Sequence, residues 1–177
     1  MTIVGTNEAP VIAINSGNSA TGTVTDTASA TTLSSAGTLS FTDVDLTDTH
    51  TVSVSSASGD LGTLTTSVAH DSTGGGAGSL AWNYTVLESV AATLAAGQTK
   101  VDTFTITVND GHGGTATQTI SVTIVGTNEA PVIAINSGNS ATGTVTDTAS
   151  TRALSSAGTL SFTDVRSEEH TSELQSH

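Results

Sequence analysis

The sequence predicts an all-β protein, an immunoglobulin- or cadherin-like sandwich of about seven antiparallel strands used in tandem repeat. Hydrophobic residues make up 35% of the chain, and they recur in short alternating runs, the period of a half-buried strand. Thr and Val favour strands, and the Gly, Asn, Asp and Ser residues between the runs favour turns. No segment is long enough for crossover helices, which disfavours a parallel βαβ architecture.

The expected strands follow one another along a single unit of the chain. In the run Val101–Val108, for example, Phe104, Ile106 and Val108 alternate and would share one face. A short helical turn is expected over Ser89–Ala96, before the last two strands. The seven expected strands are Pro10–Ile14, Gly37–Thr42, Thr49–Ser55, Gly62–Val68, Ser79–Val86, Val101–Val108 and Thr115–Val125.

The net charge of the chain excludes several kinds of partner. There are 16 Asp and Glu residues against 3 Lys and Arg, a formal net charge of −13. Such a surface repels nucleic acid and anionic membranes and attracts cations. There is no cysteine for disulfides or thiolate metal sites. No apolar run reaches the length of a membrane span, and Met1 opens on strand-like TIVG rather than on a signal peptide.

The chain repeats itself at an offset of 123 − 2 = 121 residues. Residues 2–44 match residues 123–165 except where Ala30, Thr31 and Thr32 become Thr151, Arg152 and Ala153. So long a period fits whole domains in tandem, not the turns of a solenoid. We therefore expect the last strand of a preceding repeat in 1–7, a complete repeat in 8–128 and the truncated start of the next repeat in 129–165.

Acidic and amide residues gather in three segments that the predicted topology brings to one pole. One segment precedes the first strand, one follows the second strand, and one joins the last two strands. The corresponding loops of immunoglobulin domains lie at one end of the sandwich, so we expect these three segments to lie together. Their carboxylates would repel each other unless a cation neutralised them, and Ca²⁺ takes about 6–8 oxygen ligands. The sequence therefore predicts a calcium site at the N-terminal pole. The residues expected there are Asn7, Glu8, Asp43, Asp45, Asp48 and Asp110.

The truncated repeat carries part of the same set. Asn128, Glu129 and Asp164 are equivalent to Asn7, Glu8 and Asp43. The residue equivalent to Asp45 is Arg166, which is a cation and not a ligand. The truncated repeat also ends before any equivalent of Asp110 and is too short to bury a core alone. We therefore expect this second site to be incomplete.

Other readings stay open for single residues. Asp and Asn also occupy turns because they hydrogen-bond their own backbone, and Asp26, Asp60 and Asp71 are expected to be solvated turn residues. Asp102 lies within a strand and is expected to be exposed. His50 and His112 are expected at the surface or in turns, where either could orient a neighbouring carboxylate. Their spacing does not match a zinc site.

Nothing in the chain predicts a catalytic site. No nucleophile motif is present, and the glycines of residues 74–76 lack the following Lys of a phosphate loop. We therefore predict no enzyme activity. The alternative to a structural role is a carbohydrate- or surface-ligand-binding module, which needs an exposed aromatic platform. Trp82 and Tyr84 are the candidates for it, although core packing is the expected role of both.

Several motifs occur in a characteristic order: GTNEAPVI, GTLSFTDVDLTDTHTV, WNYTV and FTITVNDGHGGTATQTISVTIVGTNEAP. Together they resemble the VCBS repeat of very large bacterial surface proteins, over essentially all of residues 2–165. The family's linker then falls on Gly5–Pro10 and Gly126–Pro131, with Glu8 and Glu129 where Asp is usual. Its DGxGG hairpin falls on Asp110–Gly114.

The resemblance implies a role as well as a fold. Repeats of this family are cadherin-like extenders of adhesins and biofilm-associated proteins of the RTX type, stiffened by calcium at their junctions. It implies export through type I secretion to the bacterial surface. The partners would be neighbouring repeats of the same chain, with cell-surface or matrix ligands bound by other domains.

The last residues differ from everything before them. Residues 166–177, RSEEHTSELQSH, contain no glycine, and the match between the two copies stops after Val165. This stretch resembles the translation of a DNA sequencing-library adapter. We therefore expect it to be non-native, with an authentic divergent tail as the alternative.

Overall fold

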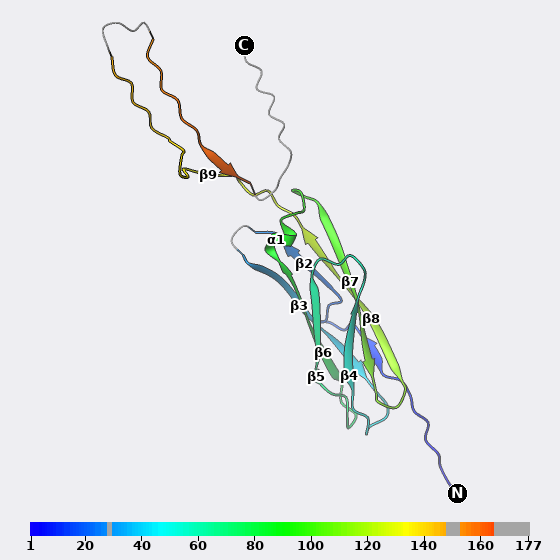
Figure 1. Cartoon of the computed structure of the whole chain (residues 1–177). Helices are drawn as coiled ribbons and strands as arrows, with labels where there is room; N and C mark the ends of the chain where they lie inside the picture. The colour runs from blue at the N-terminus through cyan, green and yellow to red at the C-terminus, as the bar shows by residue number, and fades with distance from the viewer. Residues whose placement is uncertain (28–29, 148–152, 165–177) are drawn as a thin grey trace. The chain divides into compact units, whose positions relative to one another are not determined.

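The computed structural model describes residues 1–27, 30–147 and 153–164 (Figure 1). The chain divides into unit 1, Met1–Thr127, and unit 2, Asn128–His177. The segment 166–177, expected to be non-native, lies outside the described residues.

Unit 1 is a sandwich-like arrangement of two four-stranded sheets, ordered β1-β3-β6-β5 and β2-β8-β7-β4. The all-β prediction is confirmed, and the expected helical turn is the short helix α1, Glu88–Ala91. In the described part of the chain, no helix is long and apolar enough to span a membrane. The strands are β1 Val11–Ala13, β2 Thr21–Thr25, β3 Thr32–Thr42, β4 Thr51–Ser56, β5 Thr63–His70, β6 Gly78–Leu87, β7 Thr99–Asn109 and β8 Thr115–Val125.

Strand β2 was not predicted, and it makes its sheet mixed instead of purely antiparallel. It pairs with β8 in parallel register, with Thr21 opposite Ser121 and Thr25 opposite Val125. Its sequence, TGTVT, offers only Val24 as a large apolar side chain, so it shows no alternating hydrophobic pattern. The chain can form this parallel pair because it leaves the first sheet after β1 and joins the second sheet with β2.

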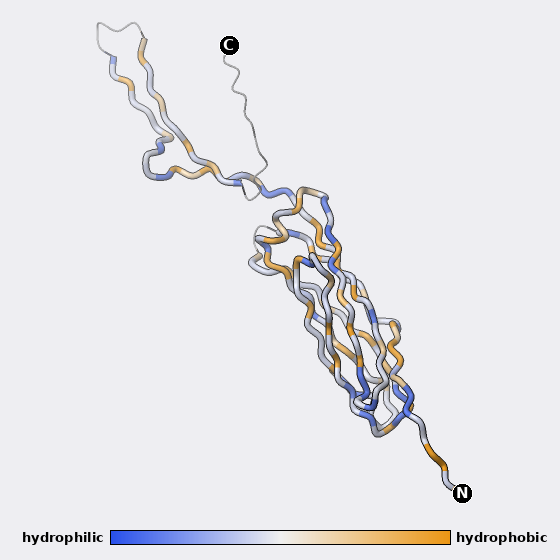
Figure 2. Tube along the Cα trace, turned by 45° about the vertical axis from the view of Figure 1, so that its right-hand side comes forward, coloured by the Kyte–Doolittle hydropathy of each residue, from blue (hydrophilic) through white to orange (hydrophobic). Residues whose placement is uncertain are grey.

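The expected strand in 1–7 is absent, because residues 1–10 are irregular. Residues 2–5, TIVG, are identical to residues 123–126, of which 123–125 belong to β8. In β8 they pair with β2 and β7, whereas Ile3 and Val4 are more than four-fifths exposed. The hydrophobic stretch near the N-terminus is visible in Figure 2. The same sequence thus forms a strand only where partner strands flank it.

The core lies between the two sheets and contains few aromatic rings. Trp82 and Tyr84 are 2% and 0% exposed, so their predicted role in core packing is confirmed. Each packs within a single cluster that also contains Phe104, Ile106 and Ile120 of the other sheet. Tyr84 and Phe104 place their ring centroids 5.8 Å apart, which ties the two sheets together by ring packing.

Glycines make room for these rings on the facing strand. Gly37 lies opposite Trp82, and Gly78 lies opposite Phe41, in the β3–β6 register. A Cβ on Gly37 would come within 2.5 Å of the indole ring, and one on Gly78 would collide with the ring of Phe41. Trp82 and Phe41 therefore lie over the glycine backbone of the neighbouring strand.

We expect Gly78→Ala to lower the free energy of unfolding by about 1–3 kcal/mol, the usual cost of overpacking a core. The ring of Phe41 is fully buried and cannot swing away from the new methyl group. Gly76→Ala is the matched control, because a Cβ there meets nothing within 4 Å. Chemical denaturation of both variants measures the difference, and equal midpoints would contradict this account of the core.

Unit 2 contains the short strands β9, Val132–Ala134, and β10, Ser161–Thr163, which pair antiparallel. Their register, Val132 opposite Thr163, equals that of β1 and β3 when 121 residues are subtracted. Phe162 is 67% exposed, whereas its equivalent Phe41 is 0% exposed. Among its described residues, unit 2 thus contains the equivalent of the β1–β3 pair but does not bury the equivalent of Phe41 in a core.

Candidate metal centre

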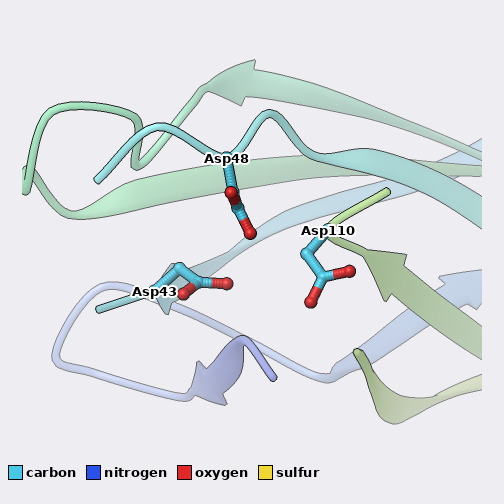
Figure 3. A group of neighbouring side chains, drawn as sticks. All are labelled: Asp43, Asp48 and Asp110. Atoms are coloured by element: carbon cyan, nitrogen blue, oxygen red, sulfur yellow. The ribbon is translucent and has the colours of Figure 1, made fainter. Parts of the chain in front are cut away.

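Three buried carboxylates converge at one pole of unit 1. One carboxylate oxygen each of Asp43, Asp48 and Asp110 lies within 4.8 Å of the others. Asp43 and Asp48 come from the loop between β3 and β4, and Asp110 comes from the hairpin between β7 and β8. Figure 3 shows the three side chains directed toward a common space. We call these three residues the Asp cluster.

The loop that carries Asp43 and Asp48 is folded by its own acidic side chains. Asp43 Oδ1 accepts a hydrogen bond from the backbone N–H of Asp45 at 2.9 Å. The N–H of Asp48 then donates to the carbonyl of Asp45 at 3.1 Å, which closes a turn. The spacing D-x-D-x-x-D therefore produces two successive turns, of the kind that Asp side chains favour. These turns bring Asp48 back over Asp43.

The hairpin NDGHGG fixes Asp110 in a similar way. Asp110 Oδ1 accepts from the N–H groups of His112 and Gly114, at 2.8 and 3.0 Å. A Cβ on Gly114 would collide with the Asp110 carboxylate, so glycine is required at that position. The hydrogen bond from Asn7, followed by those from the hairpin backbone, lowers the pKa of Asp110, although burial opposes the shift. Asp110 is therefore held as a carboxylate.

The segment before β1 is hydrogen-bonded to both acidic loops. Asn7 Nδ2 donates to Asp110 Oδ2 at 2.9 Å, and the Glu8 N–H donates to Asp45 Oδ2 at 2.8 Å. Glu8 directs its own carboxylate to Thr6 Oγ1 at 2.8 Å and is exposed. Of the residues expected at this pole, three form the Asp cluster, Asn7 and Asp45 are bonded around it, and the Glu8 carboxylate is not a member.

His50 was expected at the surface or in a turn, where it could orient a neighbouring carboxylate. It does lie in the loop before β4, but its imidazole is buried and not at the surface. Its Nε2 lies 3.1 Å from Asp43 Oδ2, and its Nδ1 lies 2.7 Å from Asp71 Oδ1. The Asp71 carboxylate also accepts from the His50 N–H at 3.0 Å. This loop residue is partly exposed, as expected, but is also hydrogen-bonded to His50. Burial lowers the pKa of His50, but the two carboxylates outweigh it and raise the pKa overall.

Asp48 has the least compensated carboxylate of the cluster. Its Oδ2 is buried and has no hydrogen-bond partner. His112 Nδ1 lies 3.3 Å from this oxygen, on a side chain that is 61% exposed. A buried carboxylate oxygen without a donor is costly, and this one is next to two other carboxylates. The three carboxylates therefore could hold a cation.

Two further acidic residues differ from their predicted surroundings. Asp102 is fully buried and accepts three hydrogen bonds at 2.8 Å each, from Leu61 N, Gly62 N and Tyr84 Oη. Asp26 is buried as well. Asp102 is in phase with Phe104, Ile106 and Val108, the buried apolar residues of the same strand, and this alternation was the available signal that it points into the core.

The predicted second site does not form a comparable group. Glu129 is buried and Asp164 is exposed, and both belong to unit 2, together with Asn128. Among the residues that the structure describes, the Asp cluster is the only group of three or more potential metal-ligating side chains. Arg166 lies outside the described residues.

The donor set of the Asp cluster suits a hard cation. It supplies carboxylate oxygens alone, and such ligands favour Ca²⁺ or Mg²⁺ over softer metals. The VCBS resemblance stays a prediction from the motifs. Comparison of the sequence with family models and with curated proteins finds no match.

Proposed function

We propose that this chain is part of a structural, calcium-stiffened extender in a large secreted bacterial adhesin or biofilm-associated surface protein. The observation that carries the proposal is the Asp cluster, together with the hydrogen bonds from Asn7 and Glu8 to the same two loops. A cation there would join both loops to the segment through which the chain enters unit 1. Location, secretion and partners follow from the VCBS resemblance.

The mechanism is electrostatic. Without a cation, the carboxylates of Asp43, Asp48 and Asp110 repel one another in a buried setting. With Ca²⁺ bound, the three carboxylates would coordinate the ion instead of repelling one another. The segment before β1 would then be held against the pole. Repeats joined in this way would form a stiff array that places a distant binding domain far from the cell.

The structural role is better supported than carbohydrate binding. Trp82 and Tyr84, the candidate stacking residues, are buried in the core and cannot contact a sugar. The outer faces of both sheets consist mainly of Ser, Thr and Ala side chains, which suit a spacer.

We expect Ca²⁺ to stabilise the chain, because an ion that binds only the folded state adds RT ln(1 + [L]/Kd). The gain is about 2.7 kcal/mol when free calcium exceeds Kd by roughly 100-fold. Thermal unfolding in Ca²⁺, in Mg²⁺ and in chelator measures it, and hydrogen exchange at residues 7–9 reports the stiffening. Identical melting curves and exchange rates in Ca²⁺ and chelator would refute the proposal.

A further inference from the structure

The chain enters and leaves unit 1 at opposite poles. Asn7 contacts Asp110, next to the last residue of β7, whereas Gly126 exchanges backbone hydrogen bonds with Gly97 and Gln98, just before its first residue. Strand β7 has 11 residues, which at about 3.4 Å per residue separate the two poles by roughly 35 Å. Tension on the chain therefore acts along the strands of the sandwich.

One pair of strands links the entering part of the chain directly to the leaving part. The edge strand β2 pairs only with β8, which leads to the exit. The five parallel partners are extended at both ends by hydrogen bonds from Ser121 N to Ala20 O and from Asp26 N to Val125 O, at 3.0 and 2.9 Å. Thr127 Oγ1 adds a bond to Asp26 O at 3.0 Å.

Side chains anchor β2 to the core as well. Val24 is buried in the main hydrophobic cluster. Trp82 Nε1 donates to Ser19 O at 2.8 Å, just before β2 begins. A Cβ on Gly22 would lie 3.2 Å from the Trp82 ring, so the strand lies closely over that ring. The pair is therefore held by backbone bonds and by packing together.

The parallel direction decides how tension loads this pair. Both strands run toward the exit pole, and Figure 1 shows their arrows ending at the same end of the sandwich. Tension pulls β2 back through its N-terminal end and β8 forward through its C-terminal end. The strands must then slide along each other, which loads all their hydrogen bonds at once instead of one after another. Strand β1 has three partners in β3 and would detach earlier.

We propose that the β2–β8 pair is a mechanical clamp that bears tension along the chain. The clamp consists of strands of unit 1 alone, so it does not depend on cation binding at the Asp cluster. Its tests are made in chelator, and they can fail or succeed whatever calcium does.

The first test compares two pulling directions on single molecules of the full chain. The chain has no cysteine, so attachment points can be introduced by Thr6→Cys with Asn128→Cys, or by Thr27→Cys with Asn128→Cys. The first pair shears β2 against β8, and the second pulls both strands from the same end and peels them apart. We expect a several-fold higher unfolding force for the first pair. Equal forces would overturn the proposal.

The second test separates mechanical from thermodynamic stability. Val24→Ala weakens β2, and Leu64→Ala removes a similarly buried side chain from β5, outside the clamp. We expect Val24→Ala to lower the shear force clearly, and Leu64→Ala to leave it near the wild-type value despite an equal or larger loss in chemical denaturation. The proposal would be overturned if, in both variants, the shear unfolding force fell in proportion to the stability measured by chemical denaturation. If Val24→Ala does not fold, the first test, which compares the two pulling directions, decides whether the proposal holds.

Discussion

Asp102→Ala is expected to lower the free energy of unfolding by about 3–5 kcal/mol, because each buried donor that loses its partner costs about 1–3 kcal/mol. The Asp102 carboxylate accepts hydrogen bonds from the N–H groups of Leu61 and Gly62, just before β5, and from the hydroxyl of Tyr84 in β6. Since Asp102 belongs to β7 in the other sheet, its loss also removes a link between the sheets. Urea denaturation measures the effect.

Two control variants resolve the contributions to this link. Tyr84→Phe removes one donor and should cost about 1 kcal/mol. Val101→Ala changes the exposed neighbour on the same strand and should stay within about 0.5 kcal/mol. If Asp102→Ala does not fold, Asp102→Asn keeps one acceptor oxygen and should show an intermediate loss. An Asp102→Asn midpoint equal to that of Val101→Ala would contradict the structural role of the carboxylate.

Asp48→Asn is expected to change stability in opposite directions with and without calcium. In chelator the substitution removes a buried charge whose Oδ2 has no hydrogen-bond partner, so stability should be unchanged or higher. In saturating Ca²⁺ the variant lacks a charged ligand and should lose most of the calcium-dependent gain, about 2.7 kcal/mol at roughly 100-fold excess over Kd. Melting curves of the variant and the wild type, in chelator and in Ca²⁺, measure both effects.

An exposed acid outside the Asp cluster provides the comparison. Asp147 is exposed, and Asp147→Asn should leave both the chelator and the calcium curves close to wild type. A calcium gain that Asp48→Asn retains in full would show that the ion binds elsewhere.

The position of the Asp cluster could be predicted because it depends on strand order alone. The loops of Asp43 and Asp110 follow strands that end at the same pole, and alternating apolar residues mark those strands. The alternation of β7 indicates that Asp102 points inward, but the hydrogen-bond partners of His50 and Asp102 could not be predicted from the sequence. Their partners, Asp71 and Tyr84, are 21 and 18 residues away, and no local spacing identifies such pairs. Strand β2 was missed because only Val24 marks its inner face.

The β2–β8 pair also determines when a repeat can finish folding. Thr21 and Ser121 are partners across 121 − 21 = 100 residues, so the loop that they close is nearly the whole unit. Pairing of such remote segments is slow, because the entropy of the loop is lost before the contacts form. A growing chain cannot close its sandwich before its last strand arrives. Until then its N-terminal hairpin resembles unit 2, where Phe162 is left exposed.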